Sequence, residues 1–152
     1  MKLAKDLREF IELLNSRGVE YLVVGGHAVA WHGHPRFTGD IDFFVRSSET
    51  NALRLIDVLE AFGFGGLGIE ASTFQRPNQV VQLGRPPNRI DLLSSISGVE
   101  FDEAWPAREL AHMDGLPVPM LGRAALVANK RASGRLKDLA DLEALGDLEP
   151  PA

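Results

Sequence analysis

Residues 40–45, Asp40-Ile41-Asp42-Phe43-Phe44-Val45, place two carboxylates in an otherwise apolar run. The run predicts a buried β-strand, and charges inside such a strand need a reason because burying an unpaired charge is costly. Alternate side chains of a strand share a face, so Asp40 and Asp42 should point the same way while Ile41 turns into the core. Two carboxylates placed in this way can share one hard cation such as Mg²⁺.

The segment before this strand predicts another strand, a glycine pair and a helix. Val19-Glu20-Tyr21-Leu22-Val23-Val24 is short and nearly all apolar, and it ends at Gly25-Gly26, with a helix expected over residues 27–32. The glycine pair permits close approach of the backbone, and N–H groups at a helix N-terminus favour phosphate oxygens. Arg36 and Thr38, just ahead of the acidic strand, add a guanidinium fork and a hydroxyl that could contact phosphate.

A third carboxylate, Asp91, lies in the middle of the apolar run Arg89-Ile90-Asp91-Leu92-Leu93. If this strand pairs beside the one that carries Asp40 and Asp42, the three carboxylates converge. They can then hold two metal ions about 3.5–4 Å apart, an arrangement used for in-line phosphoryl displacement. One ion would orient a triphosphate, and the other would lower the pKa of an attacking hydroxyl.

The remaining elements favour the α/β (α+β) class, with a small mixed sheet flanked by helices. Apolar periodicity predicts helices over residues 3–14, 49–62 with Ser48 as N-cap, 122–131 and 135–145. Residues 79–83 and 89–93 predict a hairpin, and residues 116–120 predict a short edge strand that tolerates its prolines. We expect residues 1–147 to form one domain and residues 148–152 to form a frayed tail.

Composition narrows the class of protein. A chain of 152 residues with 45% hydrophobic and 24% charged residues is typical of one globular domain. It contains no cysteine, which excludes disulfides and thiolate metal sites. A net charge of −5 argues against a main role in gripping long nucleic acid. No apolar run approaches about 18 residues, so we expect no membrane partner and a cytoplasmic location.

Together, Gly25-Gly26, Asp40-Ile41-Asp42 and the later strand acid resemble the DNA polymerase β-like nucleotidyltransferase superfamily. More narrowly, residues 36–42 (RFTGDID) and 130–141 (KRASGRLKDLAD) are similar to a small prokaryotic branch that includes AbiEii-type toxins of type IV toxin–antitoxin systems. The resemblance runs from about Tyr21 to Leu145. It implies a minimal catalytic core that transfers a nucleoside monophosphate from an NTP to a hydroxyl acceptor.

The resemblance also implies roles for individual residues. The catalytic and metal-binding residues would be Asp40, Asp42 and Asp91, holding two Mg²⁺ ions, with Mn²⁺ as a substitute. The nucleotide, ATP or another NTP, would be bound by Gly25, Gly26, Arg36, Thr38, Lys130 and Lys137. The acceptor would be tRNA or protein, and an antitoxin or a helical substrate-binding protein would be a partner. Asp138 would be a structural or catalytic partner of the lysines.

Simpler interpretations stand beside these. Lys130, Arg131, Arg135 and Lys137 also fit a solvated helix face with ion pairs between residues four apart, such as Lys137 with Asp141. A non-catalytic module that keeps the fold and binds a nucleotide or a partner is an alternative function. A subunit that is inactive without a separate substrate-binding protein is another.

Overall fold

The computed structural model describes residues 2–33 and 39–146. Six strands of this part form one mixed sheet in the order β3-β4-β2-β1-β6-β5. The strands are β1 (Tyr21–Val24), β2 (Asp40–Val45), β3 (Val80–Leu83), β4 (Arg89–Leu93), β5 (Glu109–Met113) and β6 (Leu116–Met120). The helices are α1 (Lys5–Ser16), α2 (Gly25–Trp31), α3 (Glu49–Phe62), α4 (Ala71–Gln75), α5 (Phe101–Ala104), α6 (Arg123–Ser133) and α7 (Leu136–Ala144), with a 3-10 turn, η1 (Gly65–Leu67). The predicted α/β class is confirmed.

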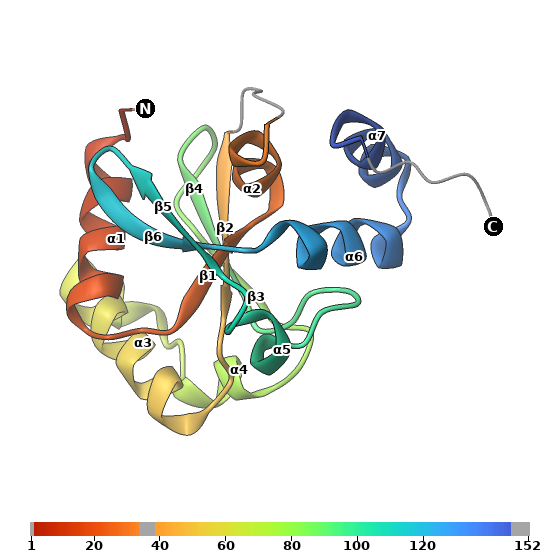
Figure 1. Cartoon of the computed structure of the whole chain (residues 1–152). Coiled ribbons are helices and arrows are strands. Elements are labelled where there is room, and N and C mark those ends of the chain that lie inside the picture. Colours follow the sequence, from red (N-terminus) through yellow and green to blue (C-terminus); the bar gives the residue numbers. More distant parts are fainter. Residues whose placement is uncertain (1, 34–38, 147–152) are drawn as a thin grey trace.

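Helices cover both faces of the sheet. Figure 1 shows α1 and α3 beside one face and α5 and α6 beside the other, with α7 beyond the end of α6. Neighbouring residues of β2 pack against these opposite layers: the ring of Phe43 lies 5.8 Å from Phe10 of α1, and the ring of Phe44 lies 5.1 Å from Phe101 of α5. Because alternate side chains share a face, Asp42 lies on the α5 and α6 side.

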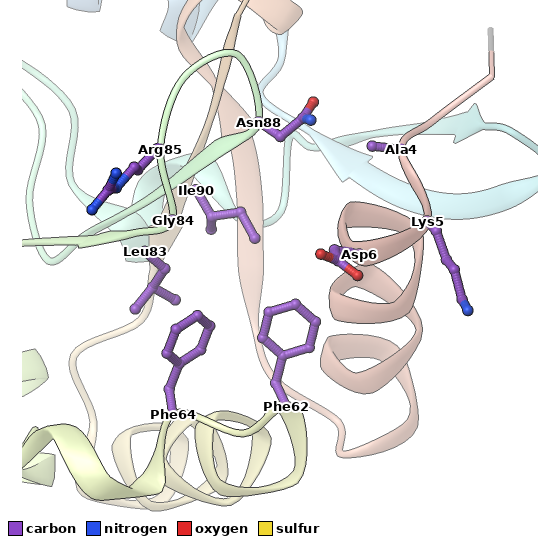
Figure 2. Close-up of a pocket in the computed structure, with 10 residues that line it drawn as sticks. All are labelled: Ala4, Lys5, Asp6, Phe62, Phe64, Leu83, Gly84, Arg85, Asn88 and Ile90. Atoms are coloured by element: carbon purple, nitrogen blue, oxygen red, sulfur yellow. The ribbon is translucent and has the colours of Figure 1, made fainter.

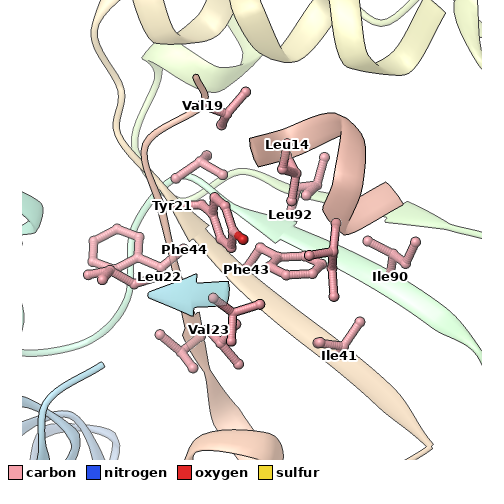
Figure 3. Close-up of a cluster of buried hydrophobic side chains, with 14 of the residues drawn as sticks. Leu14, Val19, Tyr21, Leu22, Val23, Ile41, Phe43, Phe44, Ile90 and Leu92 are labelled. Atoms are coloured by element: carbon pink, nitrogen blue, oxygen red, sulfur yellow. The ribbon is translucent and has the colours of Figure 1, made fainter. Parts of the chain in front are cut away.

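The centre of the core lies between the sheet and α1. Figure 3 shows the aromatic rings of Tyr21 and Phe43 packed together among aliphatic side chains from neighbouring strands and from α1. These two rings meet edge to face at 5.4 Å, a favoured aromatic geometry. The packing on this face holds β2 rigidly, and that rigidity fixes the acids on the other face.

Several predicted elements are confirmed. Helix α3 spans Glu49–Phe62 as expected, and the hydroxyl of Ser48 caps it by accepting a hydrogen bond of 3.2 Å from the Asn51 N–H. Strands β3 and β4 pair antiparallel as the predicted hairpin. The helix expected over residues 27–32 begins earlier, at Gly25, so the glycine pair is its first turn.

The prediction of an edge strand at residues 116–120 is wrong. Strand β6 has these bounds, but it lies between β1 and β5, and β5 is the edge strand that the sequence did not reveal. Pro117 and Pro119 pair with His112 and Leu110 of β5. A proline cannot donate to a partner strand, so Pro117 and Pro119 occupy non-hydrogen-bonded pairs of the ladder with β5. Their backbone nitrogens point to the β1 side instead. There, only Met120 is in register with Val23.

No helix in residues 2–33 and 39–146 is both long and apolar enough to cross a membrane. The proposed boundary of a tail at residue 148, like Arg36 and Thr38, lies outside the described residues.

Candidate functional site

The three predicted acids lie on adjacent strands. Strands β2 and β4 are parallel neighbours, and their register sets Asp42 directly beside Asp91 and Asp40 beside Arg89. On the other side of β2, Asp42 pairs with Val24, the last residue of β1 before Gly25. The prediction that the strand of Asp91 lies next to the strand of Asp40 and Asp42 is confirmed. We call these three carboxylates the sheet cluster.

One arginine neutralises part of the sheet cluster. The guanidinium of Arg89 donates to both carboxylate oxygens of Asp91, at 2.9 and 3.1 Å, and its Nη2 lies 2.9 Å from Oδ2 of Asp40. An arginine bound to these acids is the simpler interpretation of their sequence pattern, and the spacing Arg-x-Asp in a strand, which puts both side chains on one face, was the signal for Arg89. Among the described residues, one cation contacts the sheet cluster directly, and it bonds Asp91 and Asp40 but not Asp42.

The neighbouring carboxylates change the pKa of Asp42. Burial, the charge of Asp91 beside it, a hydrogen bond with Asp91 and the charge of Asp40 together raise the pKa of Asp42 to about 6, against an opposing effect of Lys137. A raised pKa means that the ionised carboxylate is poorly stabilised where it lies. A cation brought to Asp42 would relieve this repulsion.

Gly25 makes room for the Asp42 carboxylate. A Cβ at position 25 would lie 2.1 Å from Oδ2 of Asp42, far inside van der Waals contact. The φ angle of Gly25 is also +67°, in the left-handed region that favours glycine. The sequence suggested that this glycine lets a ligand approach the backbone. The structure shows that its neighbour Asp42 already requires it.

A cleft of about 490 Å³ opens beside the sheet cluster. Its walls come from the ends of β1, β3 and β4, from the segment after β4, and from α6. Asp42 and Gly25 line it, together with Val24, Asn78, Val80, Leu93, Ser95, Ile96, Ser97, Asn129, Lys130, Ser133 and Arg135. Of the residues predicted for the nucleotide, the structure therefore brings Gly25 and Lys130 to the cleft that Asp42 enters.

The ammonium group of Lys130 is paired with two acids. Lys130 is buried, and its Nζ lies 3.2 Å from Oδ1 of Asp138 and 3.0 Å from Oδ2 of Asp141. Asp138 also accepts hydrogen bonds from Ser133 and Arg135. We call the buried acids Asp138 and Asp141 the helix cluster. Contact of Lys130 with a phosphate stays a prediction, because its charge is already matched by two carboxylates.

The hydrogen bonds to Asp138 decide its charge state. Burial by itself would raise its pKa, but the hydrogen bonds from Arg135, Ser133 and Lys130 outweigh burial and hold the pKa below its usual range. Asp138 is therefore ionised at neutral pH and binds α7 to the end of α6. This arrangement supports the structural role for Asp138 over a role in chemistry.

Two exposed cations at the start of α7 act on the sheet cluster from a distance. The charge of Lys137 lowers the pKa of Asp42, and the charge of Asp42 raises the pKa of Arg135 after larger effects from Asp138. Sequence reasoning favoured Lys137 over Arg135, yet Arg135 is the one that lines the cleft. Gly26 lies in the first turn of α2 and is not among the lining residues.

The donor set of the sheet cluster fits Mg²⁺, which prefers carboxylate oxygens. Oδ1 of Asp40 is buried without a hydrogen-bond partner among the described residues, and Asp42 is destabilised by like charge. Yet within residues 2–33 and 39–146, no three His, Asp or Glu side chains already surround a common point as metal ligands. Arg89 provides the positive charge instead, so an ion would have to share the carboxylates with it or displace it.

A second cavity, of about 320 Å³, lies on the opposite face of the sheet. Figure 2 shows the rings of Phe62 and Phe64 beneath Ile90 and Leu83, with Asp6 of α1 at the side. Ile90 precedes Asp91 on β4 and therefore faces away from the sheet cluster. None of the three acids of the sheet cluster is among the residues that line this cavity.

Two solved structures are similar to this chain in fold. A candidate nucleotidyltransferase from Thermotoga maritima is 18% identical over 92% of this chain and 88% of its own, with a TM-score of 0.56. A nucleotidyltransferase-like antigenic protein from Paracoccidioides brasiliensis is 18% identical over 94% of this chain and 74% of its own, with a TM-score of 0.53. At this identity, the likeness shows the fold alone.

Sequence comparison is more specific. No curated protein sequence matches the chain. Residues 3–150, however, match the family described as "Nucleotidyl transferase of unknown function (DUF2204)". That match covers nearly the whole chain, and the chain belongs to this family of nucleotidyl transferases.

Proposed function

We propose that the protein is a Mg²⁺-dependent enzyme that moves a nucleoside monophosphate from an NTP to a hydroxyl acceptor. The observation that carries this proposal is the register of β2 and β4, which sets Asp91 directly beside Asp42, the one acid of the sheet cluster that lines the cleft. Membership in a nucleotidyl transferase family supports the reaction class. The AbiEii-type resemblance further suggests a toxin that modifies tRNA or protein and pairs with an antitoxin.

The residues around the cleft have distinct tasks in this reaction. Asp40, Asp42 and Asp91 would hold Mg²⁺, which supplies charge neutralisation for the triphosphate and activation of the acceptor hydroxyl. Arg135 and Lys137, at the start of α7, would bind phosphate oxygens from the side opposite the acids. Gly25 keeps the Asp42 carboxylate in its place. Contacts of Gly26, Arg36, Thr38 and Lys130 with phosphate remain predictions.

The reaction is a single displacement at phosphorus. The oxygen of the acceptor hydroxyl bonds to the α-phosphorus, and the bond from that phosphorus to the oxygen bridging to the β-phosphate breaks. Pyrophosphate leaves with the bonding electrons. The hydroxyl proton would pass to a carboxylate oxygen of the sheet cluster that does not hold the cation.

The direct test is incubation of the pure protein with NTPs labelled at the α-phosphate, with MgCl₂ or MnCl₂ and with tRNA or a protein extract as acceptor. We expect label to appear in one acceptor class. Asp42→Ala should lower the rate at least a hundredfold, because it removes a group that acts on the reacting atoms. Asp57→Asn is the matched control, because Asp57 is an exposed acid that pairs with Arg17. It belongs to α3, which lies beside the opposite face of the sheet.

A second candidate function has one observation in its favour. Arg89 already occupies the space between Asp40 and Asp91, as a counter-ion would in a module that keeps the fold without catalysis. Such a module would bind an NTP and release it unchanged. Tight NTP binding with no labelled product, in the presence of every acceptor class and of proteins co-purified from the native host, would favour this function over transfer.

A further inference from the structure

The cleft beside the sheet cluster has two chemically different ends. At one end lie the charged or polar side chains of Asp42, Lys130, Ser133 and Arg135, with Gly25 and a single aliphatic residue, Val24, beside Asp42. At the other end lie three aliphatic side chains, Val80, Leu93 and Ile96, with the polar side chains of Asn78, Ser95, Ser97 and Asn129 around them. A nucleotide has the same division, because its phosphates are charged and its base is flat, largely apolar and edged with hydrogen-bonding groups.

Strand register sets the distance between the two ends. Leu93 follows Asp91 by two residues on β4, so the two side chains share a face and lie about 7 Å apart along the strand. Val80 of β3 is directly opposite Leu93. The aliphatic end is therefore about one sugar's length from the acids, on the same face of the sheet.

Val80 is exposed where an edge strand would ordinarily carry a polar residue. Its side chain is 55% exposed, it stands on the edge strand β3, and it lines the cleft. An exposed valine on an edge invites unwanted strand pairing, which proteins commonly avoid with charged residues. Packing of the core does not account for Val80, whereas a ligand in the cleft would cover it.

Two asparagines are held in place at this end. The side-chain amide of Asn129 donates to the Ser97 carbonyl at 2.9 Å, which ties α6 to the segment after β4. Asn78 adopts a φ of +59°, its backbone N–H donates to the Ser95 hydroxyl at 2.8 Å, and its side-chain carbonyl accepts from the same hydroxyl at 3.1 Å. Each amide has a further polar atom, a carbonyl on Asn129 and an amino group on Asn78, with which to bond a ligand.

We propose that the nucleobase of the NTP binds against Val80, Leu93 and Ile96, and that Asn78 and Asn129 bond its edge and set the preference among bases. This inference rests on the proposed function, since it assigns the other end of the cleft to the triphosphate. It predicts that base and triphosphate contribute separately to affinity. An acceptor at the aliphatic end is the competing occupant, and binding without any acceptor present distinguishes the two.

The test is calorimetric titration of the whole protein with ATP, GTP, CTP, UTP and inorganic triphosphate, each with Mg²⁺ and without an acceptor. We expect the wild type to bind at least one NTP more tightly than triphosphate. Val80→Ser should raise the Kd of that NTP about fivefold, because it removes apolar contact area, and should leave the Kd of triphosphate within about twofold. Leu110→Ser is the matched control, since Leu110 is exposed on the other edge strand, β5.

A second variant tests the reading of the base edge. Asn78→Gly keeps a residue that tolerates the positive φ and removes the side chain, including the carbonyl that accepts from Ser95. We expect it to change the ratio of Kd values among the four NTPs by at least about threefold, with triphosphate unaffected. Unchanged ratios, or equal losses for NTPs and triphosphate in both variants, would overturn the inference.

The outcomes separate this inference from the proposed function. Binding that discriminates among bases, with no transfer to any acceptor, would support the base site and contradict the transferase. If the wild type binds NTPs no more tightly than triphosphate but transfers label to an acceptor, the result would contradict the base site and support the transferase. Absence of binding by all five probes would overturn both.

Discussion

Two groups of acids in this molecule have opposite electrostatic surroundings. In the helix cluster, Lys130 contacts both Asp138 and Asp141, and Asp138 has two further donors, so its pKa is lowered. In the sheet cluster, three carboxylates share one arginine, and the pKa of Asp42 is raised to about 6. The first arrangement stabilises the fold. The second destabilises it, which is expected of a site whose missing positive charge comes from a ligand.

The largest expected effect lies in the helix cluster. Lys130→Met keeps most of the side-chain volume but leaves two buried acids without their shared cation, and we expect a loss of about 3–5 kcal/mol in the free energy of unfolding. Urea unfolding measures this loss. Lys137→Met, which removes an exposed lysine from the same region, should change the free energy by less than about 0.5 kcal/mol. Equal effects of the two variants would mean that the helix cluster is not structural.

The next effect couples position 25 to the sheet cluster. Gly25→Ala should cost about 2–3 kcal/mol, because it combines a strained φ with a Cβ that displaces the Asp42 carboxylate. In an Asp42→Ala background, the same change should cost less, about 1 kcal/mol, because the strain and a 3.3 Å contact with the Cβ of residue 42 remain while the carboxylate is gone. A double-mutant cycle by urea unfolding gives the difference. Identical costs in both backgrounds would show that the carboxylate is not the obstacle.

Removing a charge from the sheet cluster should increase stability. The pKa of Asp42 is higher in the folded chain than the ordinary value of 3.8, so its contribution to stability declines as the pH rises from about 4 to about 6. Asp42→Asn should therefore raise the free energy of unfolding by about 2–3 kcal/mol at pH 7 and by nothing below pH 4. Lower stability of the variant at pH 7 would contradict the account of repulsion.

The smallest effect is that of the cation itself. MgCl₂ at ten times its Kd should stabilise the wild type by about 1.4 kcal/mol, and a thermal scan against NaCl of equal ionic strength reports it as a higher Tm. Asp42→Asn should lose most of this shift. If the shift were the same in both proteins, Mg²⁺ would be binding elsewhere.

Much of the sheet cluster could be predicted from the sequence because it depends on backbone rules. Apolar runs interrupted by single acids reveal strands, and alternation fixes the face of each acid. The helix cluster was harder. Lys130 lies on the buried side of α6 with Leu126 and Val127, four and three residues before it, and that spacing was the available signal. A lysine on an apolar stripe of a helix indicates a buried side chain that is paired with an acid.

Other features depend on contacts that a sequence pattern does not contain. Strand β5, Glu109-Leu110-Ala111-His112-Met113, mixes polar and apolar residues, and only its pairing with β6 identifies it. The pairing of Arg89 with two acids depends on register across β2 and β4. The steric overlap between a Cβ at position 25 and the Asp42 carboxylate depends on the conformation of the Asp42 side chain.

That steric overlap restricts the order in which this chain can change. Replacement of Gly25 while Asp42 is present meets a steric barrier, whereas loss of the Asp42 carboxylate first makes position 25 more permissive. Once a side chain has settled at position 25, restoring the acid at position 42 would meet the same barrier from the other direction. A lineage that gave up the carboxylate and then filled the space would have to restore glycine at position 25 before the acid at position 42.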